Sequence, residues 1–412
     1  MQIIFVCHRI PYPPNKGDKI RSFAELKALS AKHEVDVFCL YDDPEDAKYI
    51  PELEKYCRRL NAQYVPKWQS RLQTIVSLLK GEPLSVGHFR SGKLRQQVQK
   101  ALATKNYDVA VGYSSSIAQY LQQESVPRLI DIVDVDSNKW RQYSERFRGL
   151  RRFVYQLECS RMRRYEEAAV QEFDKVYVST NRERRLLDPT RSEEKIKVLE
   201  QPLDIAHVRA WDGEIPKMIA SHQPYFVFCG QMDYLPNVDA AELFCREIWP
   251  SVKEKYPDTR FVIAGRNPAK AVIRLAEEGS VIVTGAVPDM RPYLAGALAA
   301  VVPMRIACGI QTKILEALAL GVPVIATANT VEAIPEALRP MLKIAGDRAA
   351  FVEHLLELCG KRDLPDREAT ARIVAEYYQR LGMFEELLAD AERLGAKRLD
   401  QISEGSLVGG PR

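Results

Sequence analysis

The residues best suited to chemistry lie between positions 303 and 326, where two cations and a carboxylate surround a glycine. Gly309 precedes a stretch with helical spacing of its apolar residues, and Arg305 and Lys313 place positive charge around the start of that stretch. The first backbone N–H groups of a helix are unpaired and attract anions such as phosphate. Cations there oppose the helix dipole, so their presence favours an anion bound between them. Glu316, one turn after Lys313, suits ribose hydroxyl groups beside such an anion.

The surrounding pattern predicts a loop, a helix and a strand that would position these residues. Apolar residues repeat at helical spacing from about residue 311 to residue 320. Gly321 stands where a helix C-cap is expected, and Pro323 prevents the helix from continuing. The apolar residues 322–326 then predict a short buried strand.

A second candidate loop follows the first apolar strand, residues 3–7. Residues 11–18 form a long turn, a helix is expected over residues 20–32, and the next strand over residues 35–40. Open α/β sheets bind ligands at the carboxyl ends of their strands, so this loop is a candidate site. It lacks the GxGxxG pattern, so a dinucleotide site is poorly supported. A plain turn between strand and helix is an equally good interpretation.

Three aspartates, Asp131, Asp134 and Asp136, lie in and after the strand expected over residues 129–136. Three acids in six residues can bind a metal, but oxygen ligands at this spacing are common in turns, so no metal is expected. Contact with sugar hydroxyl groups is the favoured role for one of these aspartates.

Strands alternate with helices in two series, which predicts an α/β protein with two doubly wound, Rossmann-like domains. The first domain is expected over residues 1–204 and the second over residues 224–375, joined by a linker at residues 205–223. Residues 376–398 are expected to form helices that could bridge back to the first domain. Residues 399–412 are expected to be a disordered tail.

The composition is that of a globular protein with sizeable cores, since 46% of the residues are hydrophobic and 28% are charged. The net charge of +4 is unevenly spread: residues 1–205 hold 35 Lys and Arg against 28 Asp and Glu, and the remainder holds 24 against 27. Basic residues do not alternate with aromatic residues on one element, so nucleic acid is not an expected partner.

The eight cysteines are scattered and form no CxxC pair, which argues against zinc and favours a reducing cytoplasm. The N-terminus lacks the basic region and the apolar length of a signal peptide. No stretch reaches the roughly 20 apolar residues of a membrane helix. We therefore expect a cytoplasmic protein.

The most basic element is the helix expected within residues 139–165, where nine Lys and Arg accompany two Glu. Apolar residues keep helical spacing in the same stretch. A basic amphipathic helix can lie on an anionic membrane surface. A packed helix with a solvated basic face is the favoured alternative.

Together these residues resemble the retaining family 4 glycosyltransferases, which have the two-domain GT-B fold. The most specific match is Lys313-Ile-Leu-Glu-Ala-Leu-Ala-Leu-Gly-Val-Pro-Val-Ile-Ala326, which fits the family signature Glu-Ala-x-Ala-x-Gly-x-Pro-Val. Residues 11–18, 228–239 and 261–265 are further matches. Residues 131–140 look more narrowly like sugar transferases of bacterial exopolysaccharide and protein-sorting loci. The resemblance extends to about residue 395.

The resemblance implies a site for a nucleoside-diphosphate sugar, with the two domains facing each other across a cleft. Glu316 would hold the donor ribose. The expected donor-binding residues are Gly17, Asp18, Gly230, Arg266, Val287, Gly309, Ile310, Gln311 and Glu316. The expected catalytic residues are Lys313, Arg305 and Asp134, and the expected acceptor-side residues are Ser114, Asp136 and Lys139. No metal or other cofactor is expected.

The chain departs from the family pattern at the end of the site that would face the sugar. Cys308 stands where the first of two motif glutamates is usual. Gln231 and Pro236 stand where two phosphate-binding cations are usual, so Arg305 and Lys313 are the expected substitutes. The usual active-site histidine after the fourth strand is not evident, and Asp134 or Asp136 lies in that neighbourhood.

The expected reaction transfers a sugar from a nucleoside-diphosphate sugar to a hydroxyl group with retention at the anomeric carbon (EC 2.4). A glycan or lipid-linked glycan is the expected acceptor, in exopolysaccharide or cell-surface glycan synthesis, with peripheral contact at the inner face of the plasma membrane. The alternatives are a nucleotide-sugar epimerase on the same fold and a non-catalytic nucleotide-sugar-binding scaffold. A hydride-transfer enzyme is the weakest alternative. The donor sugar, its base and the acceptor stay open.

Overall fold

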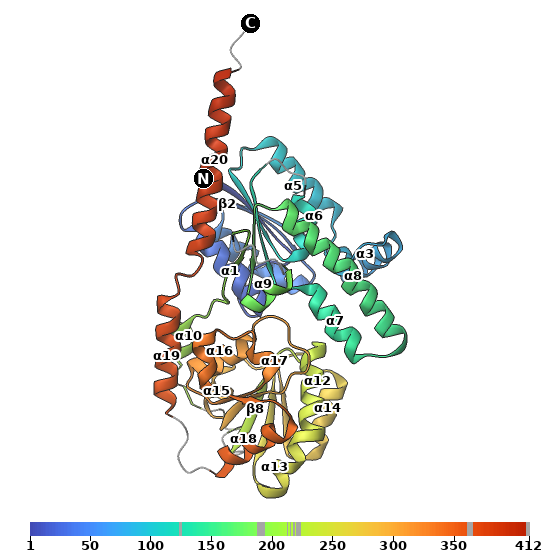
Figure 1. Cartoon of the computed structure of the whole chain (residues 1–412), viewed down its shortest axis with the longest axis vertical. Helices are drawn as coiled ribbons and strands as arrows, with labels where there is room; N and C mark the ends of the chain where they lie inside the picture. The colour runs from blue at the N-terminus through green and yellow to red at the C-terminus, as the bar shows by residue number, and fades with distance from the viewer. Residues whose placement is uncertain are drawn as a thin grey trace. The chain divides into compact units, whose positions relative to one another are not determined.

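The computed structural model describes residues 1–122, 126–187, 194–211, 213, 214, 216, 219, 224–360 and 366–408, with side chains up to residue 398. The chain forms two compact units (Figure 1). Unit 1 contains Met1–Pro202 and the chain from Gly382 onward, and unit 2 contains Leu203–Leu381.

Unit 1 is built on a sheet of seven parallel strands in the order β3-β2-β1-β4-β5-β6-β7. The strands are β1 (Gln2–Cys7), β2 (Glu34–Tyr41), β3 (Arg59–Tyr64), β4 (Val109–Tyr113), β5 (Arg128–Val133), β6 (Lys175–Val178) and β7 (Ile196–Val198). In the register of the sheet, Ile3 pairs with Val35 on one side and with Val109 on the other. Continuous apolar runs suit strands that are covered on both faces.

Helices cover both faces of this sheet. They are α1 (Gly17–Ser30), α2 (Ile50–Leu53), α3 (Lys67–Lys80), α4 (Leu84–His88), α5 (Gly92–Thr104), α6 (Ala118–Leu121), α7 (Asp136–Arg146), α8 (Gly149–Glu172), α9 (Asn181–Leu187) and α20 (Glu385–Val408). Successive side chains of β1 point to opposite faces of the sheet, as the strand period requires. Phe5 packs in the core that includes α1 and α20, and Val6 in the core that includes α5.

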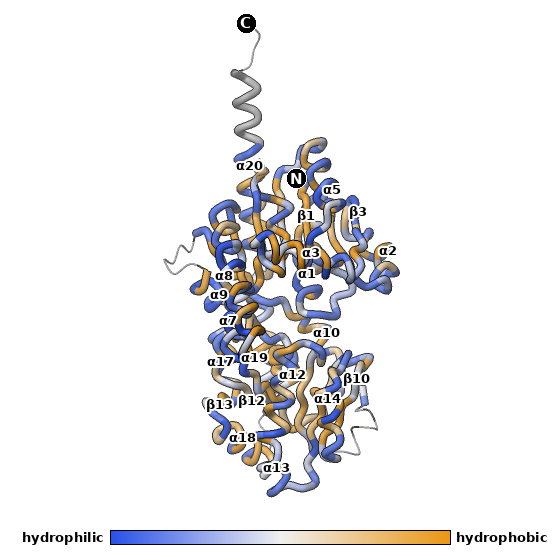
Figure 2. Tube along the Cα trace, turned by 90° about the vertical axis from the view of Figure 1, so that its right-hand side faces the viewer, coloured by the Kyte–Doolittle hydropathy of each residue, from blue (hydrophilic) through white to orange (hydrophobic). Residues whose placement is uncertain are grey.

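Unit 2 repeats this design with six parallel strands in the order β10-β9-β8-β11-β12-β13. The strands are β8 (Tyr225–Cys229), β9 (Arg260–Ala264), β10 (Val281–Gly285), β11 (Ala299–Val302), β12 (Val324–Thr327) and β13 (Leu342–Ala345). Figure 2 shows hydrophobic residues along the strands, for example in β1 and β12, where each unit has its interior.

The helices of unit 2 also lie on both sides of its sheet. They are α10 (Ile205–Arg209), α12 (Leu235–Leu243), α13 (Trp249–Lys255), α14 (Lys270–Leu275), α15 (Arg291–Ala295), α16 (Thr312–Ala319), α17 (Ala328–Val331), α18 (Arg348–Gly360) and α19 (Arg367–Arg380). Trp249 anchors one side: its indole packs on Phe244 and Phe261, and its Nε1 donates a hydrogen bond to Ser280 Oγ at 2.9 Å.

The predicted fold class of two doubly wound parallel-sheet domains is confirmed. The element boundaries differ from the expectation in three places. The expected linker at residues 205–223 begins with α10, which belongs to unit 2, and part of it lies outside the described residues. Unit 2 continues to Leu381 rather than 375. The expected tail at residues 399–412 begins as helix, since α20 runs to Val408, and residues 409–412 lie outside the described residues.

The C-terminal helix α20 packs on unit 1. Tyr177 Oη donates a hydrogen bond to Asp390 Oδ2 at 2.7 Å, and Lys197 forms an ion pair with the same carboxylate at 2.8 Å. Leu387 and Ala391 are buried in the core beside β1. Among the described residues, no helix has the length and apolar character needed to cross a membrane.

Candidate functional site

Ligand sites in open parallel sheets form where the strand order reverses, at the carboxyl ends of the central strands. In unit 2 these strands are β8 and β11, which pair with each other. The loop after β8 begins at Gly230, and the chain after β11 passes Arg305 and Gly309 before it enters α16. The sheet therefore brings these predicted catalytic and donor-binding residues onto two neighbouring loops.

Lys313 lies in the first turn of α16, with its ammonium group held on several sides. Nζ donates a hydrogen bond to Asn237 Oδ1 at 2.8 Å, lies 4.4 Å from the centroid of the Phe228 ring and approaches Met304 Sδ at 3.9 Å. Burial lowers the pKa of Lys313 to about 8, because the charged form loses its water there. An anionic ligand would restore the stabilisation that burial removes.

Glu316 lies one turn further along α16. Burial raises the pKa of Glu316 to about 7, and the charge of Lys313 opposes this shift. A carboxyl group with this pKa can accept or donate a hydrogen bond near neutral pH. Cys229 ends β8 nearby, and burial raises the pKa of its thiol to about 12, so that it stays neutral. This cluster suits a ligand that carries both negative charge and hydroxyl groups.

Two glycines let the surrounding loops approach the cluster closely. A Cβ atom on Gly265 would lie 1.7 Å from the carbonyl oxygen of Gly230, so the loops after β8 and β9 touch through their backbones. A Cβ atom on Gly230 would lie 2.7 Å from Asn237 Nδ2 and 3.3 Å from Lys313 Nζ. A larger residue in place of Gly230 would therefore displace Asn237, which holds Lys313, and a larger residue in place of Gly265 would push the two loops apart.

The loop that leads into α16 leaves backbone amides available at the helix start. Gly309 has a φ of +57°, in the left-handed region that favours glycine. Gln311 is the N-cap residue, but its side chain does not cap the helix, and its Nε2 donates to the Cys308 carbonyl oxygen at 3.2 Å. Ile310 packs against the core of unit 2. The first-turn amides of α16 can thus bind an anion.

Arg305 is already engaged by a carboxylate. Its Nε and Nη2 donate to the two carboxylate oxygens of Asp239 on α12, at 2.9 and 2.6 Å. An anionic ligand would have to compete with Asp239 for this guanidinium. Lys313 is therefore the better placed of the two predicted cations.

Arg266 and Val287 lie on the loops that follow β9 and β10. The Arg266 carbonyl oxygen accepts a hydrogen bond from the Met232 amide at 2.9 Å, which joins this loop to the one after β8. Val287 is half-buried and packs against the core of unit 2. Both residues lie on loops at the same edge of the sheet as Gly230.

In unit 1 the strand order reverses between β1 and β4, and a second polar cluster lies there. This cluster lies in the loop after β1 and at the start of α1, where Gly17 precedes Asp18. Asp18 Oδ2 accepts a hydrogen bond from Arg9 Nη1 at 3.0 Å and lies 3.6 Å from His8 Nε2. Burial alone would raise the pKa of Asp18, but its interactions with His8 and Arg9 hold it well below its usual range.

Sequence reasoning missed His8, which the structure places at the centre of this cluster. Its ring stacks on Tyr113 with the centroids 5.8 Å apart, and the edge of Phe89 packs against it. Burial lowers the pKa of His8, so the ring is neutral at pH 7. The available signal was a histidine directly after the first buried strand, at an edge where ligands bind.

Asp136 begins α7 and extends the cluster. It accepts a hydrogen bond from Ser115 Oγ at 2.7 Å and forms an ion pair with Lys139. Burial would raise the pKa of Asp136, but the charge of Lys139 and the bond from Ser115 lower it. The carboxylate also acts electrostatically on His8. The predicted acceptor-side pair Asp136 and Lys139 thus lies near the histidine.

The remaining predicted residues of unit 1 have mainly internal partners. Asp134 accepts a hydrogen bond from Ser179 Oγ at 2.8 Å, and burial raises its pKa. Ser114 has a φ of +84° and directs its hydroxyl group toward its own loop. Asp131 is fully buried and accepts a 2.5 Å hydrogen bond from Arg21 Nε. Among the described residues, no group of three His, Cys, Asp or Glu side chains could hold a metal ion.

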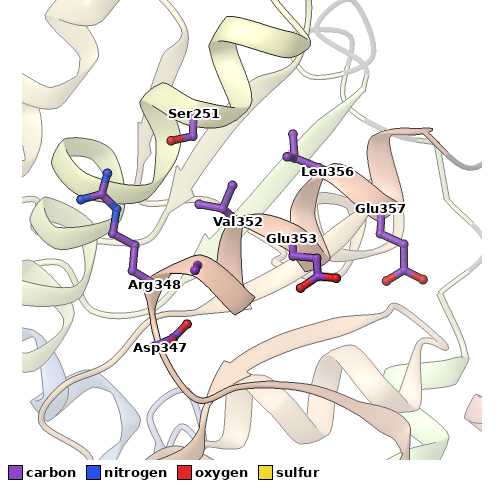
Figure 3. A pocket seen from close by; sticks show the side chains of 8 residues that line it. Ser251, Asp347, Arg348, Val352, Glu353, Leu356 and Glu357 are labelled. Carbon is purple, nitrogen blue, oxygen red and sulfur yellow. The ribbon is translucent and has the colours of Figure 1, made fainter.

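An open groove of about 810 Å³ lies elsewhere in unit 2, between α13 and the start of α18 (Figure 3). Val352 and Leu356 form its apolar floor, and Asp347, Arg348 and Glu353 stand around it. None of the predicted site residues lines this groove. The carboxyl ends of the strands, and not this groove, therefore carry the candidate chemistry.

Residues 223–361 match the family model described as glycosyl transferases group 1. This segment contains every predicted donor-side residue of unit 2. No curated protein matches the chain. Unit 2 therefore carries the sequence features of that family.

Solved structures resemble the whole chain. Sucrose-phosphate synthase from Thermosynechococcus elongatus has a TM-score of 0.63 at 18% identity, with full coverage of both chains. HepE from Anabaena in complex with UDP-glucose has a TM-score of 0.61 at 14% identity, with 97% of this chain and 100% of that chain covered. An E. coli trehalose-6-phosphate structure bound with UDP-2-fluoro glucose has a TM-score of 0.63 at 12% identity, with 96% of this chain and 99% of that chain covered. The predicted GT-B fold is confirmed.

Proposed function

We propose that this protein transfers a sugar from a nucleoside-diphosphate sugar to a hydroxyl group, with retention at the anomeric carbon. The observation that carries the proposal is the half-buried pair Lys313 and Glu316 in α16, within the segment that matches the glycosyltransferase family. A cation and helix amides suit the diphosphate, and a carboxyl group suits the ribose. Structures of the same fold that bind UDP or UDP-glucose support a uridine diphosphate sugar as the first donor to test.

In the reaction, the bond between the anomeric carbon and the β-phosphate oxygen breaks, and the acceptor oxygen bonds to the same face of that carbon. The nucleoside diphosphate leaves with both electrons, and its oxygen takes the acceptor proton. Lys313 and the first-turn amides of α16 stabilise the growing negative charge, a task that requires no metal ion. A half-buried ammonium is effective because less water screens it than at the surface.

The proposed acceptor is a glycan or a lipid-linked glycan in exopolysaccharide or cell-surface glycan synthesis. The side chains of His8, Asp136 and Lys139 in unit 1 support this assignment, because charged and neutral polar groups of this kind bind sugar hydroxyl groups. The acceptor would lie at the inner face of the plasma membrane.

A non-catalytic donor-binding scaffold is the second candidate. It is favoured by Cys308, a half-buried thiol that stands where a glutamate is usual in the resembled family. Binding of donor without consumption, with every glycan acceptor offered, would support the scaffold.

The deciding experiment incubates the protein with UDP-sugars and glycan acceptors and follows the anomeric protons by NMR. We expect a glycoside with the anomeric configuration of the donor, together with free UDP. An inverted product would refute retention, and a new sugar epimer formed from the donor alone would indicate an epimerase. A parallel thermal-shift screen measures binding, since ligand at 100 times its dissociation constant adds about 2.7 kcal/mol of stability.

A further inference from the structure

Helix α3 of unit 1 packs with its polar side inward and its apolar side outward. Ser70 and Ser77 are buried, whereas Trp68 is 67% exposed and Leu79 is 82% exposed. With Leu72 and Ile75, which are also exposed, Trp68 and Leu79 lie within roughly 60° of arc around a helix of 3.6 residues per turn. Globular proteins turn such a stripe toward the core. The exposed stripe of α3 therefore calls for a partner outside the chain.

The close packing of small residues fixes this orientation. A Cβ atom on Gly87 of α4 would lie 2.2 Å from Ser77 Oγ, so the inward side of α3 has room only for small side chains. Arg161 of α8 donates hydrogen bonds to the carbonyl oxygens of Leu78 and Glu82, both at 3.3 Å, and holds the end of the helix. Rotation of α3 would force leucine side chains against Gly87. The outward stripe is thus a consequence of the fold.

The charged residues of α3 all have one sign. The 14 residues of α3 include Lys67, Arg71 and Lys80 and no acidic residue. The middle of α8 contacts the end of α3 through Arg161, and the first turns of α8 expose Arg151 and Arg152. These turns also expose two large apolar side chains, Leu150 at 78% and Phe153 at 62%. Leu150 precedes Arg161 by eleven residues, about three turns, and so lies on the same side of α8 as Arg161.

We propose that α3, with the first turns of α8, docks the protein on an anionic phospholipid bilayer. The apolar stripe enters the boundary between headgroups and acyl chains, as in amphipathic helices that lie in the membrane plane. The surrounding cations contact lipid phosphates, which attract basic residues near the surface. Trp68 suits this boundary because its ring is apolar and its N–H is polar.

A second copy of the chain fits this surface less well. The exposed cations Lys67, Arg71 and Lys80 lie on the same helix as the apolar stripe. A symmetric dimer through α3 would place like charges opposite each other. An anionic bilayer complements both the apolar stripe and the cations.

This surface does not depend on the transfer reaction. The further step, in which this surface brings the protein to a lipid-linked acceptor, rests on the proposed function. Lipid binding is measured without donor or acceptor, so failure of one proposal is distinguishable from failure of the other.

The test is co-sedimentation of the full chain with phosphatidylcholine vesicles that contain or lack phosphatidylglycerol. We expect binding only to the anionic vesicles, weakened by salt. Ile75→Ser with Leu79→Ser should lower the partition coefficient at least about tenfold, and Arg71→Ala about fivefold. Ile273→Ser with Arg274→Ala on α14 is the matched control, because Ile273 is exposed to 51%, and it should bind normally.

The result that would overturn the proposal is equal binding of the α3 variants and the control, or no binding to anionic vesicles. If the α3 variants instead abolish self-association measured by sedimentation velocity, and no variant binds lipid, the surface joins two copies of the chain and the proposal is wrong. Circular dichroism checks that each variant folds, which is expected because every changed side chain is exposed.

Discussion

Replacement of Lys313 with methionine removes the cation from the candidate donor site and keeps an apolar stem against the Phe228 ring. Loss of one preorganised donor to a transition-state charge typically costs about 10²–10³ in turnover, or about 2.7–4 kcal/mol. We expect Lys313→Met to fall in this range. The neighbouring cation Arg305 is paired with Asp239 and cannot compensate without breaking two hydrogen bonds.

The pKa of Lys313 gives this prediction a second readout. The ligand-free group, with a pKa of about 8, loses its charge as the pH rises through that value, whereas a bound diphosphate stabilises the charged form and raises the pKa. The contribution of Lys313 to the Kd for UDP should therefore be nearly constant below pH 8. Above it the Kd should rise by up to about tenfold per pH unit, because binding must take up a proton. In Lys313→Met this rise should disappear.

Isothermal titration of UDP across this pH range measures the Kd of each variant, and steady-state transfer measures its turnover. Lys270→Met, which neutralises an exposed lysine at the start of α14, is the control and should leave both unchanged. A Lys313→Met variant with near-normal turnover and an unchanged pH profile would refute the assignment of this residue to the diphosphate.

Three further predictions follow from close contacts and charges. Gly265→Ala forces a Cβ atom against a backbone carbonyl and should lower the free energy of unfolding by about 1–3 kcal/mol in urea titrations, whereas Gly346→Ala, with open space around it, should be nearly neutral. Arg21→Met leaves the buried Asp131 charge unpaired and should cost about 3–5 kcal/mol in the same titration. His8→Phe should slow sugar transfer at least about tenfold without changing the Kd for UDP, and equal loss of both would place His8 in the donor site instead.

The alternation of apolar strands and helices predicts both sheets, but it misses one edge strand of each sheet. β3 and β13 were not predicted, and each is the outermost strand of its sheet. An edge strand is covered less completely, and β3, with the sequence RLNAQY, is only half-buried. Its sequence lacks the apolar run that identifies central strands. The strands that carry the candidate site are central, so their positions could be predicted.

The partners of charged side chains could not be predicted in the same way. Arg305 and Asp239 are 66 residues apart in sequence, and their ion pair arises only because α12 and the loop after β11 meet at one edge of the sheet. The amphipathic spacing of α3 indicates a helix but not the direction of its apolar face. That direction depends on Gly87, whose closeness to Ser77 is a tertiary contact.

Gln231 and Pro236 stand where the resembled family usually has two phosphate-binding cations, and the position of Lys313 fits their absence. In the proposed donor site, a loop without cations leaves the diphosphate to a cation from another element, and Lys313 of α16 is that cation. Asn237, the residue after Pro236, accepts the hydrogen bond from Lys313 Nζ that positions it, and Gly230 leaves the space in which it lies. Asn237→Ala should therefore weaken UDP binding through the position of the lysine. A combined Asn237→Ala and Lys313→Met variant should then bind UDP no worse than Lys313→Met alone, and additive losses would show that Asn237 contacts the ligand itself.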